Sequence, residues 1–417
     1  MKGKKRIAAI KGTKDILPQE ARSWQWVEAE AKRIFELYGY REIRTPIFEA
    51  TELFKKGTGQ TSDIVIKEMY TFQDKGGRSL TLRPEYTPSV VRAIIEKRIY
   101  LKPQPLRFYY IGPMFRYDKP QKGRYRQFHQ MDIEVFGEQD AAIDAEIVEM
   151  ADFLLHRLRV SDIETLVNSV GCKQCRPLYL KKLRQQAEAT KDILCPDCQR
   201  KIVANPLRIF DCKVESCREA SAGFPYITDY LCSDCRLHFQ RFRSYLDLFR
   251  INYRVEPRLV RGIDYYTKTT FEIISSRLGA QDAILGGGRY DNMMHDFGGP
   301  DMCGIGFAVG MERLISLVPF SKKTEKFLYV AYLGEEAKRQ AMVAVRKLRQ
   351  KGIECLMEYK ERSLKSQLTR ANKLEASWVL IVGEDELRKQ KFQLKDMSTG
   401  LQQEVNLDNL LSILQAK

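Results

Sequence analysis

Residues 105–137 read PLRFYYIGPMFRYDKPQKGRYRQFHQMDIEVFG, which predicts two strands joined by a basic loop. The second strand, residues 128–136, alternates strictly, and successive side chains of a strand point to opposite faces. One face is therefore apolar, whereas the other carries Gln130, Asp132 and Glu134. This pattern fits the solvated face of an antiparallel sheet, and it equally fits the floor of a site for a polar ligand.

The loop between the two strands is strongly basic. Arg116 stands at its entrance, and four further cations follow within eight residues: Lys119, Lys122, Arg124 and Arg126. Cations beside a polar sheet face suit a polyanion such as a nucleotide or an RNA end. A solvated hairpin tip would carry the same residues, so the loop alone leaves both interpretations open.

The composition describes a globular chain with an excess of positive charge. Its 417 residues are enough for two or three domains; 44% of them are hydrophobic and 30% are charged. The net charge of +16 favours acidic partners, above all nucleic acid, with charge for solubility as the alternative. No apolar run approaches the roughly 20 residues that span a bilayer. The start of the chain, MKGKKRIAAIKG, is basic, and its apolar stretch is too short for a secretory signal. We therefore expect a cytoplasmic protein without a membrane partner.

Eight of the ten cysteines crowd into residues 171–238. They form four close pairs, three of which are C-x-x-C: Cys172 and Cys175, Cys195 and Cys198, Cys212 and Cys217, Cys232 and Cys235. In a reducing compartment such pairs bind metal more often than they form disulfides. The first two pairs are nineteen residues apart, which lies within the range of Cys-only zinc sites, and eight ligands could serve two ions.

Structural zinc is the favoured interpretation of these cysteines, and idle reduced thiols in a helical insertion are the alternative. Four thiolates leave no open position on the ion, so catalytic zinc is not expected. Core-like sequence resumes after the insertion, and we expect residues 1–170 and 239–321 to form one α+β core. After a short polar linker, strands alternate with helices, which predicts a separate parallel or mixed α/β domain over residues 322–417.

Three further motifs carry chemically useful groups. Glu85 lies on a turn between two prolines, where a carboxylate could grip an ammonium group or simply cap a helix. Arg261 opens the run RGIDYY, and the three glycines at 286–288 would let a ligand approach the backbone closely. Arg313 falls in the first turn of a predicted helix, either beside a ligand or in a surface ion pair.

Taken together, these motifs resemble the bacterial histidyl-tRNA synthetase family of class II aminoacyl-tRNA synthetases. GYREIRTPIFE resembles class II motif 1, FRYDKPQKGRYRQFHQMDIEVFG resembles motif 2, and GIGFAVGMERL resembles motif 3. RLVRGIDYYTKTTFEI and GGGRYD resemble two histidine-specific signatures, and LRPEYTPSVVRA resembles the amino-acid-binding turn. The resemblance covers nearly the whole chain. Tyr86, where the family usually has glycine, and Asn292, where RYDGL is commoner, depart from the pattern without removing a charged group.

The resemblance implies a ligase that works in two steps. L-histidine and ATP with Mg²⁺ would form histidyl-adenylate and pyrophosphate, and the histidine would then pass to the 3′ end of tRNA(His). It implies a homodimer, an insertion domain at residues 171–238 that contacts the tRNA acceptor arm, and an anticodon-binding domain at 322–417. Zinc in the insertion rests on the cysteine spacing and not on the resemblance.

The resemblance also implies roles for single residues. Arg116 and Arg261 would be catalytic groups on the α-phosphate of ATP, while Phe128 and Arg313 would sandwich the adenine. Lys122 and Arg124 are candidates for contact with the tRNA acceptor end. The implied histidine-binding residues are Glu85, Thr87, Gln130, Glu134, Tyr265, Tyr266 and Tyr290.

Two other interpretations use the same fold. One is a synthetase-like paralogue that regulates ATP phosphoribosyltransferase; such proteins typically lack the anticodon domain and a complete RGIDYY run. The other is a non-catalytic RNA-binding protein. Arg116, Arg261 and Arg313 argue against the latter, because three arginines around one phosphate site are costly without an anion.

Overall fold

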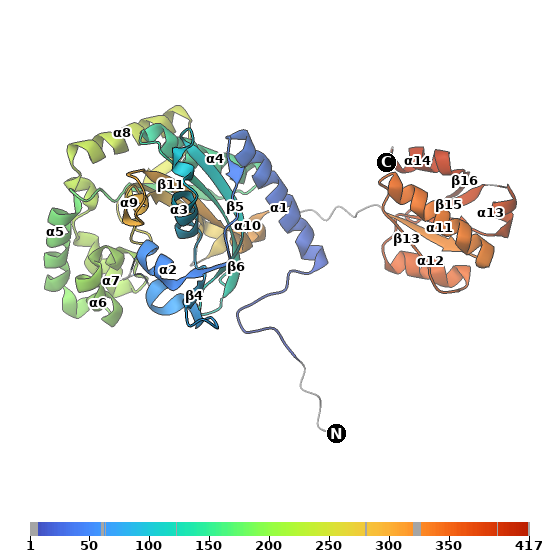
Figure 1. Cartoon of the computed structure of the whole chain (residues 1–417), viewed down its shortest axis with the longest axis horizontal. Coiled ribbons are helices and arrows are strands. Elements are labelled where there is room, and N and C mark those ends of the chain that lie inside the picture. The colour runs from blue at the N-terminus through green and yellow to red at the C-terminus, as the bar shows by residue number, and fades with distance from the viewer. Residues whose placement is uncertain are drawn as a thin grey trace, which may run out of the picture. The chain divides into compact units, whose positions relative to one another are not determined.

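The computed structural model describes residues 7–59, 62, 64–121, 123–279, 282–319, 327–389 and 391–415. The chain divides into two compact units, Met1–Phe320 and Ser321–Lys417, which Figure 1 draws in full. Across these described residues, no helix combines the length and the apolar character that a membrane crossing requires.

An eight-stranded sheet forms the centre of the first unit. Its order is β1 (Arg41–Glu42), β5 (Leu106–Phe115), β6 (Gln127–Phe136), β11 (Gly304–Gly310), β10 (Ala283–Arg289), β9 (Thr267–Ser275), β7 (Ile163–Ser169) and β8 (Tyr253–Val255). The six inner strands are antiparallel to one another, whereas β1 and β8 pair in parallel at the two edges. The predicted strand pair over 105–137 is confirmed as β5 and β6, which are the second and third strands from the β1 edge of the sheet.

The apolar face of β6 packs under two long helices, α1 (Pro18–Leu37) and α4 (Ala141–Arg157). Met131, Ile133 and Val135 join this main core, as their alternation predicted. The opposite face of β6 is covered as well: α3 (Thr87–Glu96) and α9 (Met293–Asp296) contribute to a second apolar cluster there. Asp132 and Glu134 are each only 3% exposed, so the solvated-face interpretation is wrong for this part of the strand.

A smaller sheet stands beside the first and has the order β2 (Phe48–Ala50), β4 (Ser79–Leu82), β3 (Tyr70–Gln73). Its β3–β4 pair is the hairpin that the glycines at 76 and 77 indicate, and Gly77 has a φ of +76°. α2 (Thr51–Gly57) follows β2 directly, and α10 (Met311–Leu317) follows β11.

The cysteine-rich segment is helical and contains α5 (Arg176–Ala189), α6 (Pro196–Ala204), α7 (Glu215–Ala220) and the start of α8 (Ser233–Leu248). It has its own apolar cluster, in which four buried cysteines pack with residues such as Tyr179 and Leu183, and the other four cysteines pack against that cluster. α8 leads back into the core, because Cys235 belongs to the insertion's cluster while Phe239 belongs to the main core. In Figure 1 these helices are drawn in green and yellow-green.

The second unit is a mixed α/β domain with the strand order β13 (Cys355–Met357), β12 (Leu328–Tyr332), β14 (Trp378–Val382), β15 (Phe392–Asp396) and β16 (Gln402–Val405). The first three strands are parallel and the last two pairings are antiparallel. Its helices are α11 (Glu335–Gln350), α12 (Leu364–Lys373), α13 (Glu384–Lys389) and α14 (Leu407–Gln415). Ser363 caps α12, since its side chain accepts a hydrogen bond from the Ser366 amide.

Candidate active site

The candidate site lies on the face of the sheet that is turned away from α1 and α4. Glu134 on β6 pairs with Gly306 on β11, and Gly306 pairs with Gly288 on β10. Directly paired residues of antiparallel strands point to the same face. The carboxylate of Glu134 therefore stands beside two positions without side chains, and it fills the space that a Cβ atom would take at Gly306.

The glycine run 286–288 has a different use from the one its sequence indicates. The prediction was that a ligand approaches the bare backbone there. Instead, the guanidinium of Arg261 lies where a Cβ of Gly286 would be, and the ring of Tyr266 would lie 2.8 Å from a Cβ of Gly288. The glycines thus admit two side chains of the site itself to the surface of the sheet.

Glu85 is buried beneath the site. It accepts hydrogen bonds from the hydroxyl of Thr58 and, at 3.0 Å, from that of Tyr265. Burial raises the pKa of this carboxyl group. No side chain caps the N terminus of α3, which begins after Tyr86, so the helix-cap interpretation of Glu85 is wrong.

Glu134 lies between two hydroxyl groups from distant parts of the chain. Thr87 donates to it at 2.5 Å, and Tyr290 donates to its other oxygen. Burial raises the pKa of Glu134 from 4.5 to about 8, although both hydroxyl donors oppose the shift. A pKa in that range favours a protonated carboxyl group here at neutral pH.

The three tyrosines of the predicted histidine set line the same space. The rings of Tyr265 and Tyr266 are 4.9 Å apart, and those of Tyr265 and Tyr290 meet edge to face at 5.5 Å. Burial raises the pKa of Tyr266 to about 12, so its hydroxyl group stays protonated. Among the described residues, the buried side-chain oxygen of Gln130 has no hydrogen-bond partner, which leaves an acceptor for a ligand.

Asp132 is a site residue that the predictions did not include. It is buried on the same strand face, where burial and then the charges of Glu134 and Glu85 raise its pKa well above the usual range. One of its oxygens also lacks a partner in the described part of the chain. The alternation of β6 places Asp132 on this face and was the signal that could have found it. Three buried carboxyl groups make this end of the site suited to a cationic or hydrogen-donating ligand.

The other end of the site is rich in arginine. Arg116, at the end of the β5 strand, donates from Nε to the Pro84 carbonyl at 2.8 Å. Its guanidinium lies 5.2 Å from the centre of the Phe128 ring, on the paired strand β6. Phe128 therefore faces the site, as its parity with Gln130 predicted.

Arg261 and Arg313 reach the same region from later parts of the chain. Arg261 pairs with Glu272 on β9, and its Nε has no partner among the residues described. Arg313 donates to the Ala283 carbonyl at 2.8 Å. Burial lowers the pKa of Arg313, and the charges of three nearby arginines lower it further: Arg124, Arg261 and Arg116. The predicted arginines thus meet in space, and Arg313 is half-buried there.

Of the two loop residues predicted to contact tRNA, the structure describes only Arg124. Arg124 pairs with Asp118 and lies 3.8 Å from Glu68, so it is held by acidic groups of the hairpin and its neighbour. Lys122 lies outside the described residues. The contact of these two residues with an acceptor end stays a prediction.

The eight insertion cysteines gather into two groups of four. The neck cluster comprises Cys172, Cys175, Cys232 and Cys235, and the distal cluster comprises Cys195, Cys198, Cys212 and Cys217. Spacing alone suggested that the first pair joins the second. In the structure the first pair joins the last, because the chain leaves and re-enters the core at the same place.

Both clusters have the dimensions of a zinc site. Neighbouring sulfurs lie 3.7 and 3.9 Å apart in the neck cluster and 3.9 Å apart in the distal cluster. Zn²⁺ holds thiolates at about 2.3 Å, so a tetrahedral site needs sulfurs about 3.8 Å apart, whereas a disulfide needs about 2.05 Å. All the cysteines are free thiols.

Backbone donors favour the thiolate form at one cysteine of each cluster, whereas burial raises the pKa of four others: Cys175, Cys198, Cys217 and Cys235. The Gln174 amide donates to the Cys172 sulfur at 3.4 Å, and the Cys232 amide donates to Cys175 at 3.2 Å. Burial opposes ionisation of Cys172, but backbone donors overcome it and lower its pKa to about 7. The pKa of Cys195 in the distal cluster is likewise lowered to about 7. Thiolate is the form that binds metal.

Comparison with known proteins agrees with this architecture. A family model described as histidyl-tRNA synthetase matches residues 12–194 and 213–314, and an anticodon-binding-domain model matches residues 318–417. A histidine–tRNA ligase of Halothermothrix orenii is 50% identical over 98% of this chain and 99% of its own length. One of Caldanaerobacter subterraneus is 48% identical over 96% of this chain and 98% of its own.

Solved structures show the same likeness. The apo histidyl-tRNA synthetase of S. aureus superposes with a TM-score of 0.83 at 35% identity, covering 98% of this chain and 100% of that one. A Bacillus halodurans protein, titled ATP phosphoribosyltransferase regulatory subunit/histidyl-tRNA synthetase, has a TM-score of 0.65 at 20% identity and shares the fold alone; 91% of this chain and 99% of that one are covered. With the α+β core, the cysteine-rich helical segment and the anticodon-binding domain all present, the chain belongs to the histidyl-tRNA synthetase family of ligases.

Proposed function

We propose that this chain activates L-histidine with ATP and transfers it to the 3′ end of tRNA(His). The observation that carries the proposal is that one face of the sheet has two chemically different ends. Buried carboxyl groups and tyrosines form one end, and Arg116, Arg261 and Arg313 form the other. A substrate pair with a hydrogen-donating ring and a triphosphate matches that division.

At the carboxylate end, histidine would be read by its two ring nitrogens. Glu134 accepts from one ring N–H, and the hydroxyl of Tyr266 pairs with the other nitrogen, while Tyr290 holds Glu134 in place. Glu85, Thr87 and Gln130 would contact the ammonium and carboxylate groups, with Tyr265 orienting Glu85. Sites built on such hydrogen bonds reject poorer partners by about 10⁴–10⁵, because the wrong ligand leaves buried groups unpaired.

At the arginine end, ATP would be held for in-line attack. The histidine carboxylate attacks the α-phosphorus, the bond to the bridging oxygen breaks, and pyrophosphate leaves. Arg116 and Arg261 stabilise the charge that develops on the α-phosphate oxygens, and Phe128 with Arg313 encloses the adenine. Mg²⁺ neutralises phosphate charge when it is bound, and Glu272, beside Arg261, is a hard oxygen donor of the kind it prefers.

In the second step a ribose hydroxyl of the terminal adenosine attacks the acyl carbon of the adenylate, and AMP leaves. The loop residues Lys122 and Arg124 would guide the acceptor end to this point, and the net charge of +16 favours tRNA binding in general. We assign residues 1–170 and 239–321 to catalysis, 171–238 to an insertion on the acceptor arm, and 322–417 to the anticodon. Such a protein would work in the cytoplasm, where tRNA is charged.

We also propose that each cysteine cluster holds one structural Zn²⁺ ion. Four thiolates close the coordination sphere, so the metal would stabilise the insertion and take no part in the reaction. Metal analysis of protein purified without chelator should find two zinc ions per chain, one for each cluster. A metal-free protein with eight reactive thiols would contradict the proposal.

A homodimer is supported by one open apolar surface. The register of the smaller sheet places six residues on a single face: Phe48, Ala50, Tyr70, Phe72, Leu80 and Leu82. Phe48 is 53% exposed and Phe72 is 44% exposed. A second copy would bury this face, and sedimentation should show two chains together. Replacing Phe48 and Phe72 by aspartate should give monomers, and a monomeric parent protein would refute the dimer.

The decisive experiment for the activity is ATP–pyrophosphate exchange with each amino acid in turn. Exchange should occur with histidine and with no other amino acid, and charging of tRNA(His) should follow. Exchange with a different amino acid would refute the substrate. Absence of all exchange, with tRNA binding retained, would instead favour the non-catalytic RNA-binding protein.

A further inference from the structure

The end of the insertion touches the loop that carries Tyr266. We infer that the neck cluster, once it holds its metal, positions the Tyr266 loop through Arg176, so that metal binding in the insertion sets the enzyme's affinity for histidine. Here the Tyr266 loop means residues 261–268. This inference rests on the proposed function, because it concerns histidine binding at the same site.

The first link is a backbone contact at the base of the insertion. The Val170 amide donates to the Lys268 carbonyl at 2.7 Å, and the Lys268 amide donates to the Gly171 carbonyl at 2.9 Å. Cys172 follows Gly171 directly. The neck cluster therefore begins one residue after Gly171. The backbone partner of Gly171, Lys268, lies two residues from Tyr266.

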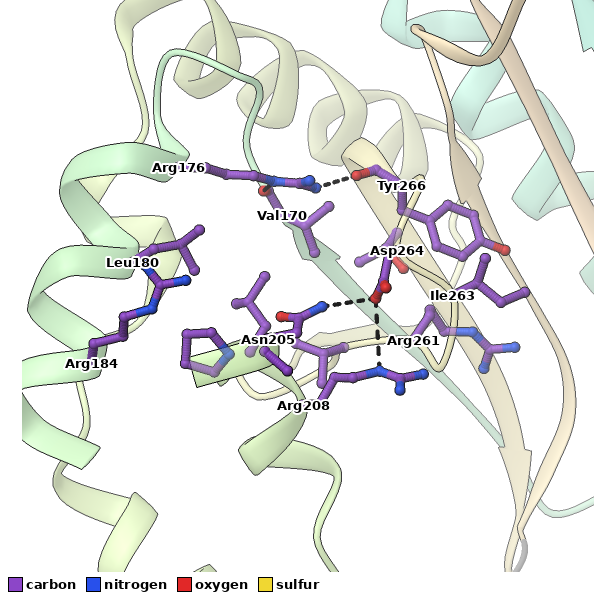
Figure 2. A pocket seen from close by; sticks show the side chains of 15 residues that line it. Val170, Arg176, Leu180, Arg184, Asn205, Arg208, Arg261, Ile263, Asp264 and Tyr266 are labelled. Atoms are coloured by element: carbon purple, nitrogen blue, oxygen red, sulfur yellow. Dashed lines mark hydrogen bonds and ion pairs between the residues drawn. The ribbon is translucent and has the colours of Figure 1, made fainter. Parts of the chain in front are cut away.

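The second link is Arg176, the residue after Cys175 and the first of α5. Its Nε donates to the Val170 carbonyl at 3.2 Å, and its terminal nitrogen donates to the carbonyl of Tyr266. Figure 2 shows this side chain extending from the insertion to Tyr266. A metal on Cys172 and Cys175 would fix the turn from which Arg176 projects, and thereby the backbone that aims the Tyr266 ring.

The other end of the loop is held by a different part of the insertion. Asn205 donates to Asp264 at 2.8 Å, and Arg208 donates to the Gly262 carbonyl. These residues lie between the two halves of the distal cluster, each several residues from a cysteine, and their hydrogen bonds reach Asp264 and Gly262 rather than the backbone of Tyr266. The neck cluster should consequently have the stronger effect on histidine, and the distal cluster the weaker one.

Arg176→Ala tests the link without touching a metal ligand. The variant should keep its zinc and its Michaelis constant for ATP, while the constant for histidine in exchange rises by about tenfold or more, as expected for a lost buried hydrogen bond. Equilibrium binding of histidine should weaken by the same factor. Arg176→Lys, which retains a donor, should recover part of the loss.

Arg184→Ala is the matched control. Arg184 lies on the same helix and lines, with Arg176, the pocket drawn in Figure 2, but its donors reach the carbonyls of Ile202 and Val203 within the insertion. This variant should bind histidine as the parent does. Equal losses for Arg176→Ala and Arg184→Ala would overturn the inference, as would an unchanged histidine affinity in Arg176→Ala.

The role of the metal is tested by Cys172→Ser beside Cys195→Ser. Each should lose about one zinc ion, and only the neck variant should lose most of its histidine affinity. Hydrogen exchange on the parent chain after treatment with chelator covers the case in which a variant fails to fold. Amides of residues 266–268 should then exchange faster, and unchanged protection there would overturn the inference. Histidine-dependent exchange by the parent chain tests the proposed function separately.

Discussion

The guanidinium of Arg261 occupies the space that a Cβ atom would fill on Gly286. Gly286 is paired across the sheet with Glu272, and Glu272 is the carboxylate that pairs with Arg261. A bare backbone position and a neighbouring carboxylate thus hold the arginine flat against β10. Its position depends on the absence of a side chain as much as on the presence of a partner.

Gly286→Ala should therefore displace Arg261 while leaving its charge in the protein. We expect the rate of adenylate formation to fall by about 10²-fold, because groups that stabilise a transition state must be accurately placed. Single-turnover kinetics with ATP and histidine measure this directly. Gly223→Ala is the control, since no atom lies within 4 Å of a Cβ there. A Gly286→Ala enzyme of normal rate would show that Arg261 tolerates displacement.

Arg261→His removes the fork of donors rather than moving it. Adenylate formation should slow by about 10²–10³-fold if Arg261 stabilises charge on the α-phosphate. Histidine binding measured without ATP should change little, which separates a role in chemistry from general damage to the site. Unchanged turnover would mean that Arg116 alone carries the role assigned to both arginines.

Glu134→Gln should change both selectivity and pH dependence. The folded-state pKa of Glu134 is raised by burial from 4.5 to about 8, so the folded protein binds this proton more tightly than the unfolded chain. That contribution to stability is fully present below pH 4.5 and is lost as pH rises through about 8. Glutamine carries no such proton, so the variant should gain in thermal midpoint relative to the parent as pH rises.

The same substitution should weaken histidine binding by about 10²-fold or more, because glutamine cannot ionise to meet a ring N–H as the carboxyl group can. Calorimetric unfolding between pH 5 and 9 and histidine titration at pH 8 are the two measurements. A parent and a variant with parallel pH profiles would show that Glu134 is already ionised before histidine binds.

Asp144→Ala should strongly destabilise the first unit. Asp144 and Arg289 are fully buried, with 2.6 Å between carboxylate and guanidinium, and His238 contacts the same carboxylate at 2.8 Å. Burial opposes its ionisation, but Arg289 and His238 hold the pKa of Asp144 below its usual 3.8. Its stabilising contribution is therefore present above about pH 4 and is lost as pH falls further. Removal leaves a buried arginine whose remaining ion-pair partner is Asp291 at 3.5 Å, at a cost of about 3–5 kcal/mol.

Chemical unfolding at neutral pH checks this expectation, with Glu164→Ala as its control. Glu164 pairs with Arg254 at the surface, where the side chains are 47% and 51% exposed, and such pairs contribute at most about 1 kcal/mol. Similar losses for the two variants would mean that the buried network contributes no more than an exposed pair.

Local patterns in the sequence predicted the elements of the site, and tertiary packing decided what each element does. The alternation of β6 is a signal within a few residues, so that prediction held. Burial of Asp132 is different, because α3 and α9 come from distant segments and cover the strand only in the folded chain. No local signal could separate a solvated face from a covered one.

The cysteines show the same limit. Spacing favoured the first two pairs as one site, whereas Cys172 and Cys175 meet Cys232 and Cys235 from the far end of the insertion. Residues 286–288 were correctly expected to allow a close approach. The groups that approach them are Arg261 and Tyr266. The sequence around the glycines could not predict this, because the fold alone brings those two residues there.

The neck cluster has a consequence for the order in which the chain assembles. β7 and β9 are adjacent in the sheet, yet Ser169 and its partner Thr269 are about 100 residues apart along the chain. A metal that joined Cys172 to Cys235 would shorten the free path of chain between Ser169 and Thr269 to about 40 residues. The entropic cost of closing that loop would then fall by about 1 kcal/mol. An insertion that folds early would then bring β9 close to β7. The β7–β9 contact would form as fast as a contact between residues much closer in sequence.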